Sequence, residues 1–287
     1  MTSPSVLIAL HPDRAEAAEV ALDLVTWLEG RGYRVVMDAE AAAGADLVRL
    51  TAADDVLEGT GALAVCLGGD GTMLATFERV ARYGIPVLGI HLGNLGYLTE
   101  FEPSETIVAV QQALDGELPI EERMMVSARI ERADGSMEGP WDGLNEVVVE
   151  KRAQGHTVRL AVSLDDVSFA TYAADGLIVA TPTGSTGYSM SARGAIVDPS
   201  HRALQLTPVA PHMLFDRSLL LQPETSVRIA VVGDREANCS VDGRSVAVLQ
   251  AGDSLVATAA ATPALLVTSG QRGFHQVLRE KFGLKDR

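Results

Sequence analysis

The sequence predicts an α/β amino-terminal domain with a parallel sheet, followed by a β-rich, sandwich-like carboxy-terminal domain. In the first half of the 287-residue chain, short apolar runs alternate with stretches of helical periodicity, as expected for parallel strands joined by helices. After about residue 121, apolar and polar residues alternate with a period of two, which is typical of strands with one covered face. Hydrophobic residues make up 47% of the chain, which is enough for a folded core and excludes a disordered protein.

Four short apolar runs in the first half are expected to form buried parallel strands. They are residues 6–10, 34–37, 62–67 and 86–90. Between the first two runs, apolar residues recur at helical spacing up to Gly30, and Asp13 can cap the helix that they predict. A further helix is expected from about Thr72 to Tyr83, between the last two strands.

The second half contains alternating runs that are expected to be half-buried strands. They include residues 126–131, 157–164 and 227–231. Asp165-Asp166 and Asp242-Gly243 lie between strand-like runs and are expected to form turns, the second of them a hairpin turn. An apolar strand over residues 264–267 precedes a short amphipathic helix over residues 274–282. We therefore place the two domains at residues 1–121 and 122–265.

The chain is acidic, with a formal net charge of −15 and a pI near 4.8. Because nucleic-acid-binding domains normally carry a basic face, this charge argues against a nucleic-acid partner and favours an enzyme that acts on small molecules. Two cysteines are too few for a metal cluster or a disulfide framework, and they indicate a cytoplasmic protein with reduced thiols. We expect neither a membrane span nor a signal peptide, since the sequence has no run of 18 apolar residues and no basic leader.

The segment Gly68-Gly69-Asp70-Gly71-Thr72 directly follows a predicted buried strand and directly precedes a predicted helix. Glycines at such a position let a ligand approach the backbone, and the N–H groups at a helix start can bind phosphate oxygens. A carboxylate among them would repel phosphate unless it handles a cation or removes a proton from a hydroxyl nucleophile. The alternative is that Asp70 caps the helix while the glycines turn the chain.

A second segment, residues 175–189, runs from an apolar strand into a stretch that is dense in hydroxyl groups and glycine. Many donors with little bulk can wrap a ribose or a phosphate. The alternative is a loop whose serine and threonine side chains bond to its own backbone.

The dipeptide Asn145-Glu146 stands just before an apolar run at residues 147–149. An amide beside a carboxylate can bind an adenine edge or ribose hydroxyls, although an ordinary polar strand edge has the same composition. Two other patterns predict no site. The histidines lack the spacing of metal ligands, and the G-x-G-x-x-A sequence at residues 59–64 precedes a strand instead of opening a helix.

Together these residues resemble the NAD kinase family. The strand–GGDGT–helix unit at residues 68–72 is similar to the nucleotide-binding corner shared by NAD kinases, diacylglycerol kinases and sphingosine kinases. The order of the remaining motifs selects NAD kinases. Those motifs are Gly93 to Thr99, similar to a GxLGFLT element, Asn145-Glu146, similar to an NE pair, and residues 175–188, similar to a DG…TPTGSTAY segment with Ser191 at the family spacing. The resemblance covers roughly residues 5–280.

The resemblance implies transfer of the γ-phosphoryl group of ATP, or of inorganic polyphosphate, to the 2′-hydroxyl of the adenosine ribose of NAD. It implies that Mg²⁺ or another divalent cation assists and that the protein is a homodimer or homotetramer. Residues 1–121 would then form the nucleotide-binding domain and residues 122–265 the NAD-binding domain, with a tail at 266–287 that returns to the first domain.

By the same resemblance, Asp70 is expected to be the catalytic carboxylate, acting on the 2′-hydroxyl. Gly68, Gly69, Gly71 and Thr72 are expected to bind the nucleotide phosphates. The residues expected to bind NAD are Leu74, Tyr97, Asn145, Glu146, Asp175, Thr186, Gly187, Tyr188 and Ser191. We expect no protein ligand to a metal, because magnesium usually binds through phosphates and waters.

The chain departs from the family pattern at several positions. Gly187 replaces a common alanine and removes a methyl group from the pocket, and Tyr97 replaces a common phenylalanine. Arg193 stands where glycine is frequent, and its cation either binds phosphate or points to solvent. These changes leave open a paralogue that phosphorylates another nucleoside or a lipid, or a non-catalytic NAD-binding sensor. The sequence also leaves open ATP or polyphosphate as donor, and NAD or NADH as acceptor.

Overall fold

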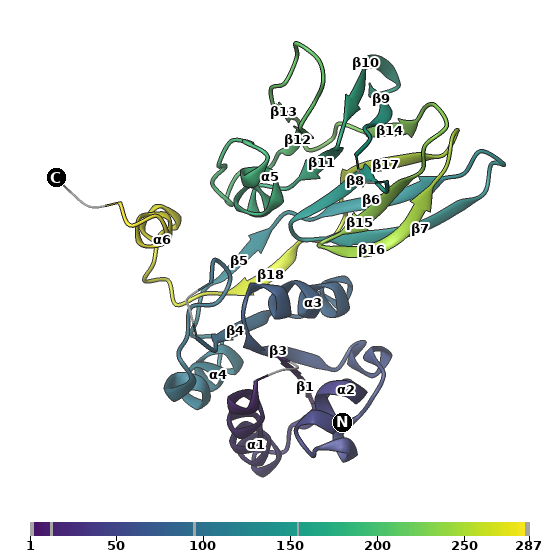
Figure 1. The fold of residues 1–287 in the computed structure, drawn as a ribbon. Coiled ribbons are helices and arrows are strands. Elements are labelled where there is room, and N and C mark those ends of the chain that lie inside the picture. Colours follow the sequence, from purple (N-terminus) through teal and green to yellow (C-terminus); the bar gives the residue numbers. More distant parts are fainter. Residues whose placement is uncertain (1–2, 12–13, 94–95, 154, 285–287) are drawn as a thin grey trace. The chain divides into compact units, whose positions relative to one another are not determined.

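The computed structural model describes residues 3–11, 14–93, 96–153 and 155–284, which fold into two compact units (Figure 1). Unit 1 comprises Met1–Glu122 and Ala264–Arg287, and unit 2 comprises Arg123–Pro263. Asp13, which was expected to cap the first helix, lies outside the described residues, and Arg14 occupies the N-cap position of that helix. None of the described helices is long and apolar enough to cross a membrane.

Unit 1 contains a six-stranded sheet in the order β2-β1-β3-β4-β18-β5. The strands are β1 (Ser5–Leu10), β2 (Arg34–Val36), β3 (Gly61–Gly68), β4 (Val87–His91), β5 (Ile120–Arg123) and β18 (Ala264–Val267). The pairs formed by β1 with β2 and β3, and by β4 with β3 and β18, are all parallel. The predicted parallel sheet is therefore confirmed, and a strand from near the carboxyl end of the chain belongs to it.

Helices cover both faces of this sheet, with α3 on one side and α1 and α4 on the other (Figure 1). The helices of unit 1 are α1 (Ala15–Gly30), α2 (Ala39–Gly44), α3 (Asp70–Val80), α4 (Thr106–Leu114) and α6 (Phe274–Lys281). Four short 3₁₀ segments accompany them at Val48–Leu50, Asp54–Leu57, Ala81–Tyr83 and Pro103–Glu105. The helix expected from Thr72 begins two residues earlier, at Asp70, because the Gly69 carbonyl already accepts a hydrogen bond from the Met73 N–H.

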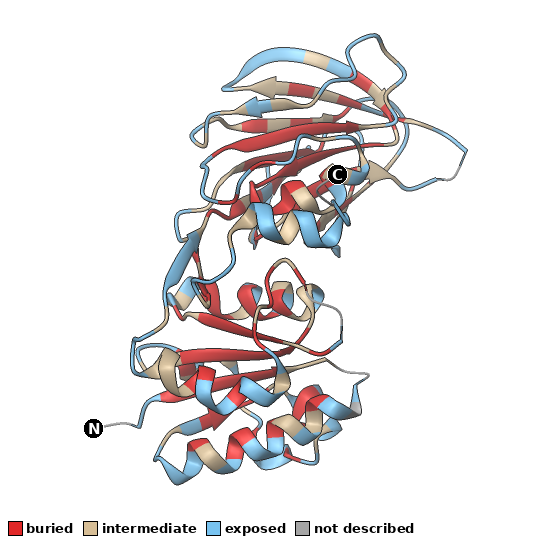
Figure 2. Ribbon diagram, turned by 90° about the vertical axis from the view of Figure 1, so that its left-hand side faces the viewer, coloured by how far each residue is buried: buried red, intermediate tan, exposed pale blue. Residues whose placement is uncertain are grey.

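The core of unit 1 lies between the sheet and its helices. Alternate residues of β1, such as Val6 and Ile8, pack with Leu24 and Leu28 of α1, and all four are fully buried. Figure 2 shows that the central strands of this sheet are buried along most of their length. Strands buried on both faces explain the nearly continuous apolar runs in the sequence.

Unit 2 consists of two six-stranded antiparallel sheets, in the orders β10-β9-β14-β17-β6-β7 and β13-β12-β11-β8-β15-β16. The strands of the first sheet are β6 (Val126–Glu131), β7 (Met137–Gly143), β9 (Val158–Leu164), β10 (Val167–Ala174), β14 (Val227–Val231) and β17 (Ser254–Ala259). Those of the second are β8 (Glu146–Lys151), β11 (Gly176–Ala180), β12 (Leu204–Val209), β13 (Leu219–Leu221), β15 (Ala237–Val241) and β16 (Arg244–Leu249). Side chains of both sheets, including Val147, Leu160, Tyr172, Leu177 and Leu255, form one buried cluster, so the predicted sandwich-like architecture is confirmed.

Both predicted turns of unit 2 are present. Asp165 and Asp166 have φ values of 50° and 63°, and Asp242 and Gly243 have φ values of 46° and 79°. Two consecutive residues with positive φ form the type I′ turn that suits the twist of a hairpin, and they join β9 to β10 and β15 to β16. Aspartate and glycine tolerate this conformation better than other residues do.

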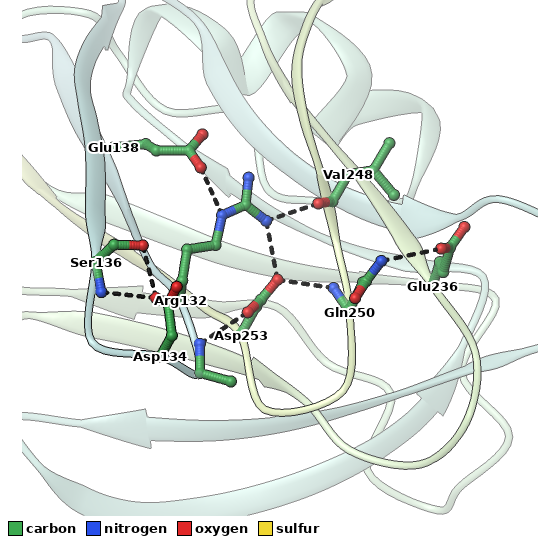
Figure 3. Close-up of polar contacts among 9 residues, drawn as sticks. Arg132, Asp134, Ser136, Glu138, Glu236, Val248, Gln250 and Asp253 are labelled. Atoms are coloured by element: carbon green, nitrogen blue, oxygen red, sulfur yellow. Dashed lines mark hydrogen bonds and ion pairs between the residues drawn. The ribbon is translucent and has the colours of Figure 1, made fainter.

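A polar network joins two connections of unit 2, one after β6 and one before β17 (Figure 3). The Arg132 guanidinium donates to Asp253 Oδ2 at 2.9 Å and to Glu138 Oε1 at 2.6 Å. Asp253 is only 5% exposed, and its carboxylate also accepts hydrogen bonds from the N–H groups of Ala133 and Gln250. Burial alone would raise the pKa of Asp253, but these N–H donors and the Arg132 charge bring it below its ordinary value. The network therefore holds the two connections together through a charged carboxylate.

Candidate functional site

The glycine-rich segment of unit 1 joins the carboxyl end of β3 to the start of α3. Strand β3 ends at Gly68, Gly69 is the N-cap residue, and α3 begins at Asp70. The first N–H groups of an α-helix have no partner within the helix, and they carry the positive end of its dipole. The loop is therefore suited to receive an anion.

A pocket of about 440 Å³ lies beside this loop in unit 1. Its described lining residues are Leu10, His11, Arg14, Gly69, Gly71, Thr72, Ala75 and Leu92. Sequence reasoning did not identify His11 and Arg14 as site residues. A sequence rule could have found them, because β1 and β3 are adjacent parallel strands and the residues that follow their carboxyl ends meet at one edge of the sheet.

The Asp70 carboxylate is held by the loop that follows β4. Its Oδ2 accepts a hydrogen bond from the Tyr97 N–H at 2.9 Å, and its Oδ1 accepts one from the Leu98 N–H at 3.0 Å. The N-cap residue of α3 is Gly69, and Asp70 is the first residue of the helix, with its carboxylate bonded to the Tyr97 and Leu98 N–H groups. The described lining of the pocket includes Gly69 and Gly71 but not Asp70.

Gly96 makes this arrangement possible. A Cβ atom at position 96 would lie 2.0 Å from Asp70 Oδ1 and 2.8 Å from Asp70 Cγ, distances that atoms in proteins do not adopt. The absence of a side chain therefore lets the carboxylate approach the backbone of the loop. Asn94 and Leu95, which belong to the same sequence motif, lie outside the described residues.

Leu74 and Tyr97, which were expected to bind NAD, are both half-buried in unit 1. Burial raises the pKa of the Tyr97 phenol, and the nearby Asp70 charge raises it further. The ammonium group of Lys281 in α6 lies 4.5 Å from the centre of the Tyr97 ring, which is a cation–π distance. The carboxy-terminal helix therefore contacts the residue whose N–H group binds Asp70.

In unit 2, Asn145 and Glu146 stand at the start of β8. The Asp242 carboxylate of the β15–β16 turn accepts hydrogen bonds from the N–H groups of Leu144, Asn145 and Glu146 at 2.7 to 3.0 Å. The Asn145 carbonyl accepts from the Thr181 N–H at 2.8 Å. The backbone of the Asn145-Glu146 pair is therefore fixed from two sides.

Glu146 is a buried acid, with 7% of its surface exposed. Burial, followed by the nearby Asp242 charge, raises the pKa of its carboxyl to about 7, although the Tyr188 N–H acts in the opposite direction. Its Oε2 atom is buried and has no hydrogen-bond partner among the described residues. A Cβ atom at Gly187 would lie 2.9 Å from this oxygen, so the missing methyl group leaves Glu146 uncrowded.

Most of the hydroxyl groups in the Ser/Thr-rich segment are bonded inside the protein. Thr181 donates to the Leu144 carbonyl, Thr186 to the Thr183 carbonyl and Ser185 to the Val197 carbonyl. The Ser189 hydroxyl donates to Gln205 at 2.6 Å. Of these four hydroxyl groups, only that of Thr186 bonds to the backbone of its own segment, as the alternative of a self-satisfied loop expects. The other three bond to residues elsewhere in unit 2. The segment forms a 3₁₀ turn, Thr183–Thr186, followed by the short helix α5, Tyr188–Ser191.

The remaining predicted NAD-binding residues lie near this segment in unit 2. Asp175 forms an ion pair with Lys151, with 2.7 Å between Oδ1 and Nζ. Burial raises the pKa of the Tyr188 phenol, and the charges of Glu150, Asp175 and Glu146 raise it further. Tyr188 and Ser191 are exposed. Glu146 begins β8 opposite Ala180 at the end of β11, whereas Asp175 precedes β11 at its other end, where Gly176 pairs with Glu150. Thr186, Gly187, Tyr188 and Ser191 lie in and between the 3₁₀ turn and α5.

Arg193 is exposed, and it adopts the left-handed conformation with φ of 64° two residues after the end of α5. Its N–H group donates to the Met190 carbonyl at 3.0 Å, as in a helix C-terminal turn. This conformation favours glycine and costs an arginine about 1 kcal/mol. It gives a physical reason for a glycine at this position.

The described residues contain no cluster of three or more His, Cys, Asp or Glu side chains that could hold a metal ion. Cys66 and Cys239 are buried free thiols whose pKa burial raises to about 12, so neither is suited to bind a metal or to act as a nucleophile.

Two family models match the chain. Residues 6–118 match the ATP-NAD kinase N-terminal domain, and residues 144–269 match the ATP-NAD kinase C-terminal domain. An NAD kinase from Heliobacterium modesticaldum is 41% identical over 281 residues, which cover 97% of this chain and 98% of the relative. An NAD kinase from Moorella thermoacetica is 40% identical over 271 residues, which cover 94% of this chain and 86% of the relative.

Two solved structures share the fold. The crystal structure of yeast NADH kinase complexed with NADH has a TM-score of 0.90 at 23% identity, covering 100% of this chain and 89% of the yeast chain. An NAD kinase from Archaeoglobus fulgidus in complex with ATP has a TM-score of 0.74 at 24% identity, covering 97% of each chain.

Proposed function

Because the chain belongs to the ATP-NAD kinase family, we propose that unit 1 binds the phosphates of the donor and supplies the catalytic carboxylate, while unit 2 binds NAD. The protein is an NAD kinase, a phosphotransferase that uses ATP. It transfers the γ-phosphoryl group to the 2′-hydroxyl of the adenosine ribose and so makes NADP. The family assignment favours neither a lipid or nucleoside kinase nor a non-catalytic sensor.

Gly68, Gly69, Gly71 and Thr72 are the donor-phosphate residues of this proposal. The start of α3 presents unpaired N–H groups beside a pocket that Gly69, Gly71 and Thr72 line. Phosphoryl transfer depends mainly on positioning and on charge stabilisation, which such groups supply.

Asp70 is the proposed general base. A ribose hydroxyl is a poor nucleophile at neutral pH, and a correctly placed base contributes about 10²- to 10⁴-fold. The observation that carries this assignment is the orientation of the carboxylate by the Tyr97 and Leu98 N–H groups. These two bonds use two of the roughly four lone-pair sites of a carboxylate, so acceptor capacity remains for the 2′-hydroxyl proton.

The proposed NAD-binding residues are Leu74, Tyr97, Asn145, Glu146, Asp175, Thr186, Gly187, Tyr188 and Ser191. Glu146 offers an oxygen without a hydrogen-bond partner among the described residues, and burial makes such an atom costly unless a ligand bonds to it. Leu74 and Tyr97 supply half-buried apolar surface. Mg²⁺ enters the proposal as the ion that the triphosphate carries, where it would neutralise phosphate charge near Asp70.

We also propose a cytoplasmic homodimer or homotetramer, from the cysteine content and the family resemblance. Light scattering coupled to size-exclusion chromatography measures the assembly directly. A monomer at working concentration would contradict this part of the proposal.

The central test is the reaction itself. The purified protein, incubated with Mg²⁺, ATP and a panel of NAD, NADH, nucleosides and lipids, is expected to phosphorylate NAD, with products identified by mass. Asp70→Asn is expected to lower kcat by at least about 100-fold while NAD binding is kept. Nearly unchanged turnover in this variant would exclude the base role.

A further inference from the structure

We propose that Arg14 is a donor-binding residue, whose guanidinium binds the phosphoanhydride chain of the phosphoryl donor in the pocket beside the glycine-rich loop. This inference rests on the proposed kinase function and identifies a residue of its donor site that lies outside every motif described above. ATP and inorganic polyphosphate share the phosphoanhydride chain, so the proposal applies to both.

The position of Arg14 places a cation on the same pocket as the glycine-rich loop. Arg14 stands at the N-cap of α1, after β1, and it lines the pocket together with Gly69, Gly71 and Thr72. Of the described lining residues, Arg14 alone carries a permanent positive charge. The pocket thus combines backbone N–H groups at the start of α3 with a guanidinium.

The guanidinium has unused hydrogen-bonding capacity. Its Nη1 donates to the Leu92 carbonyl, and no other partner exists among residues 3–11, 14–93, 96–153 and 155–284. A guanidinium has five N–H donors in a planar fork, and this fork binds two phosphate oxygens at once. An exposed arginine that lines a pocket with most of its donors unpaired is suited to bind an anion.

The Arg14 guanidinium lies close to the backbone of Gly93, which follows Leu92. Gly93 has φ of +95°, and a Cβ atom there would lie 2.6 Å from Arg14 Nη1. The backbone conformation at position 93 therefore favours glycine, and the Arg14 guanidinium lies directly against this residue. The single bond to Leu92 orients the side chain at the pocket and leaves the rest of the fork for a ligand.

The acidity of the protein is a reason to expect a cation in the donor pocket. The protein has a net charge of −15, and Asp70 adds a carboxylate next to the glycines that line the pocket. A donor with several phosphate charges would be repelled by this field, and a cation on the pocket wall offsets the repulsion.

The test is a kinetic comparison of the full-length wild type with Arg14→Ala and Arg14→Lys. We expect Arg14→Ala to raise the KM for ATP by about 10- to 100-fold, while the KM for NAD stays within about twofold of the wild type. Arg14→Lys keeps the charge without the fork and should recover part of the loss. The same measurements with inorganic polyphosphate in place of ATP show whether binding of both phosphoryl donors depends on Arg14.

A matched control is Arg34→Ala, which removes the same charge from unit 1. Arg34 is exposed and begins β2, whose amino end lies at the sheet edge opposite to the pocket, because β1, β2 and β3 are parallel. Its kinetic constants should match those of the wild type. If Arg14→Ala and Arg34→Ala raised the KM for ATP equally, the loss of one positive charge anywhere in unit 1 would explain the result, and the proposal would be overturned.

Calorimetric titration with inorganic tripolyphosphate separates this inference from the proposed function. Arg14→Ala is expected to bind tripolyphosphate about tenfold more weakly than the wild type does, whatever the acceptor is. If the wild type makes no NADP, the kinase proposal fails, and the titration still decides the role of Arg14. Equal tripolyphosphate affinities, or a KM for ATP that Arg14→Ala leaves unchanged, would overturn the inference.

Discussion

Replacing Gly96 with alanine is expected to displace the Asp70 carboxylate and to abolish most of the activity. The new Cβ would lie 2.0 Å from Asp70 Oδ1, whereas ordinary contacts begin at 3.4 Å, so the oxygen must move by about 1.4 Å. That movement breaks the hydrogen bonds from Tyr97 and Leu98, which hold the carboxylate at 2.9 and 3.0 Å. A misplacement of about 1 Å costs roughly 100-fold in rate, so kcat should fall by about 100-fold or more.

The assay is steady-state kinetics with ATP and NAD, accompanied by titration with tripolyphosphate. Because Asp70 is not among the described lining residues of the pocket, tripolyphosphate affinity should be unchanged in Gly96→Ala. Gly30→Ala is the matched control, since nothing lies within 4 Å of a Cβ atom at that position in α1. A folded Gly96→Ala protein with kcat within about threefold of the wild type would refute the claim that the loop positions the catalytic base.

Three further substitutions test the energetics of unit 2. Arg193→Gly should raise the free energy of unfolding by about 1 kcal/mol in urea titrations, because φ of 64° favours glycine, and a loss of stability would contradict this. Burial raises the pKa of Glu146 to about 7 in the folded protein, whereas its pKa in the unfolded chain is near 4.5. The stability that the protonated Glu146 contributes to the folded state is therefore fully present below pH 4.5 and is lost as the pH rises through 7. The wild type should therefore lose about 3 kcal/mol over that range relative to Glu146→Gln, and parallel pH profiles of the two proteins would exclude the shift. Arg132→Met leaves the 5% exposed Asp253 without its cation and should cost about 2–3 kcal/mol in unfolding free energy at pH 7. Below about pH 4 the difference from the wild type should shrink, because Asp253 becomes protonated as the pH falls through its lowered pKa, and a constant difference would exclude the pair as its cause.

The spacing of apolar residues was sufficient to predict the fold class, because the strands within each half of the chain share one pattern of burial. Strands β1 and β3 are buried on both faces, and strands β6 and β9 alternate, so each has a distinct signature in sequence. Boundaries were less accurate. The start of α3 at Asp70 depends on the Gly69 carbonyl, which no side-chain pattern reveals.

The candidate site was only partly visible in the sequence. Motif positions led to Asp70 and Asn145-Glu146. The composition of the Ser/Thr-rich segment suggested more hydroxyl groups available to a ligand than the structure offers, since Ser185 and Ser189 are bonded to residues that pack beside them. Such partners are distant in the chain. Arg14 was missed for the same reason, because its place beside the glycines follows from the pairing of β1 with β3.

The insertion of β18 into the first sheet has a consequence for synthesis on the ribosome. Residues 264–267 pair with β4, so that sheet lacks a strand until these residues, which follow all of unit 2, have emerged. Unit 2 is contiguous in sequence and has all its strands before then. During synthesis the edge of β4 at Val87 and Leu88 is therefore expected to stay without its partner strand while unit 2 completes its own core.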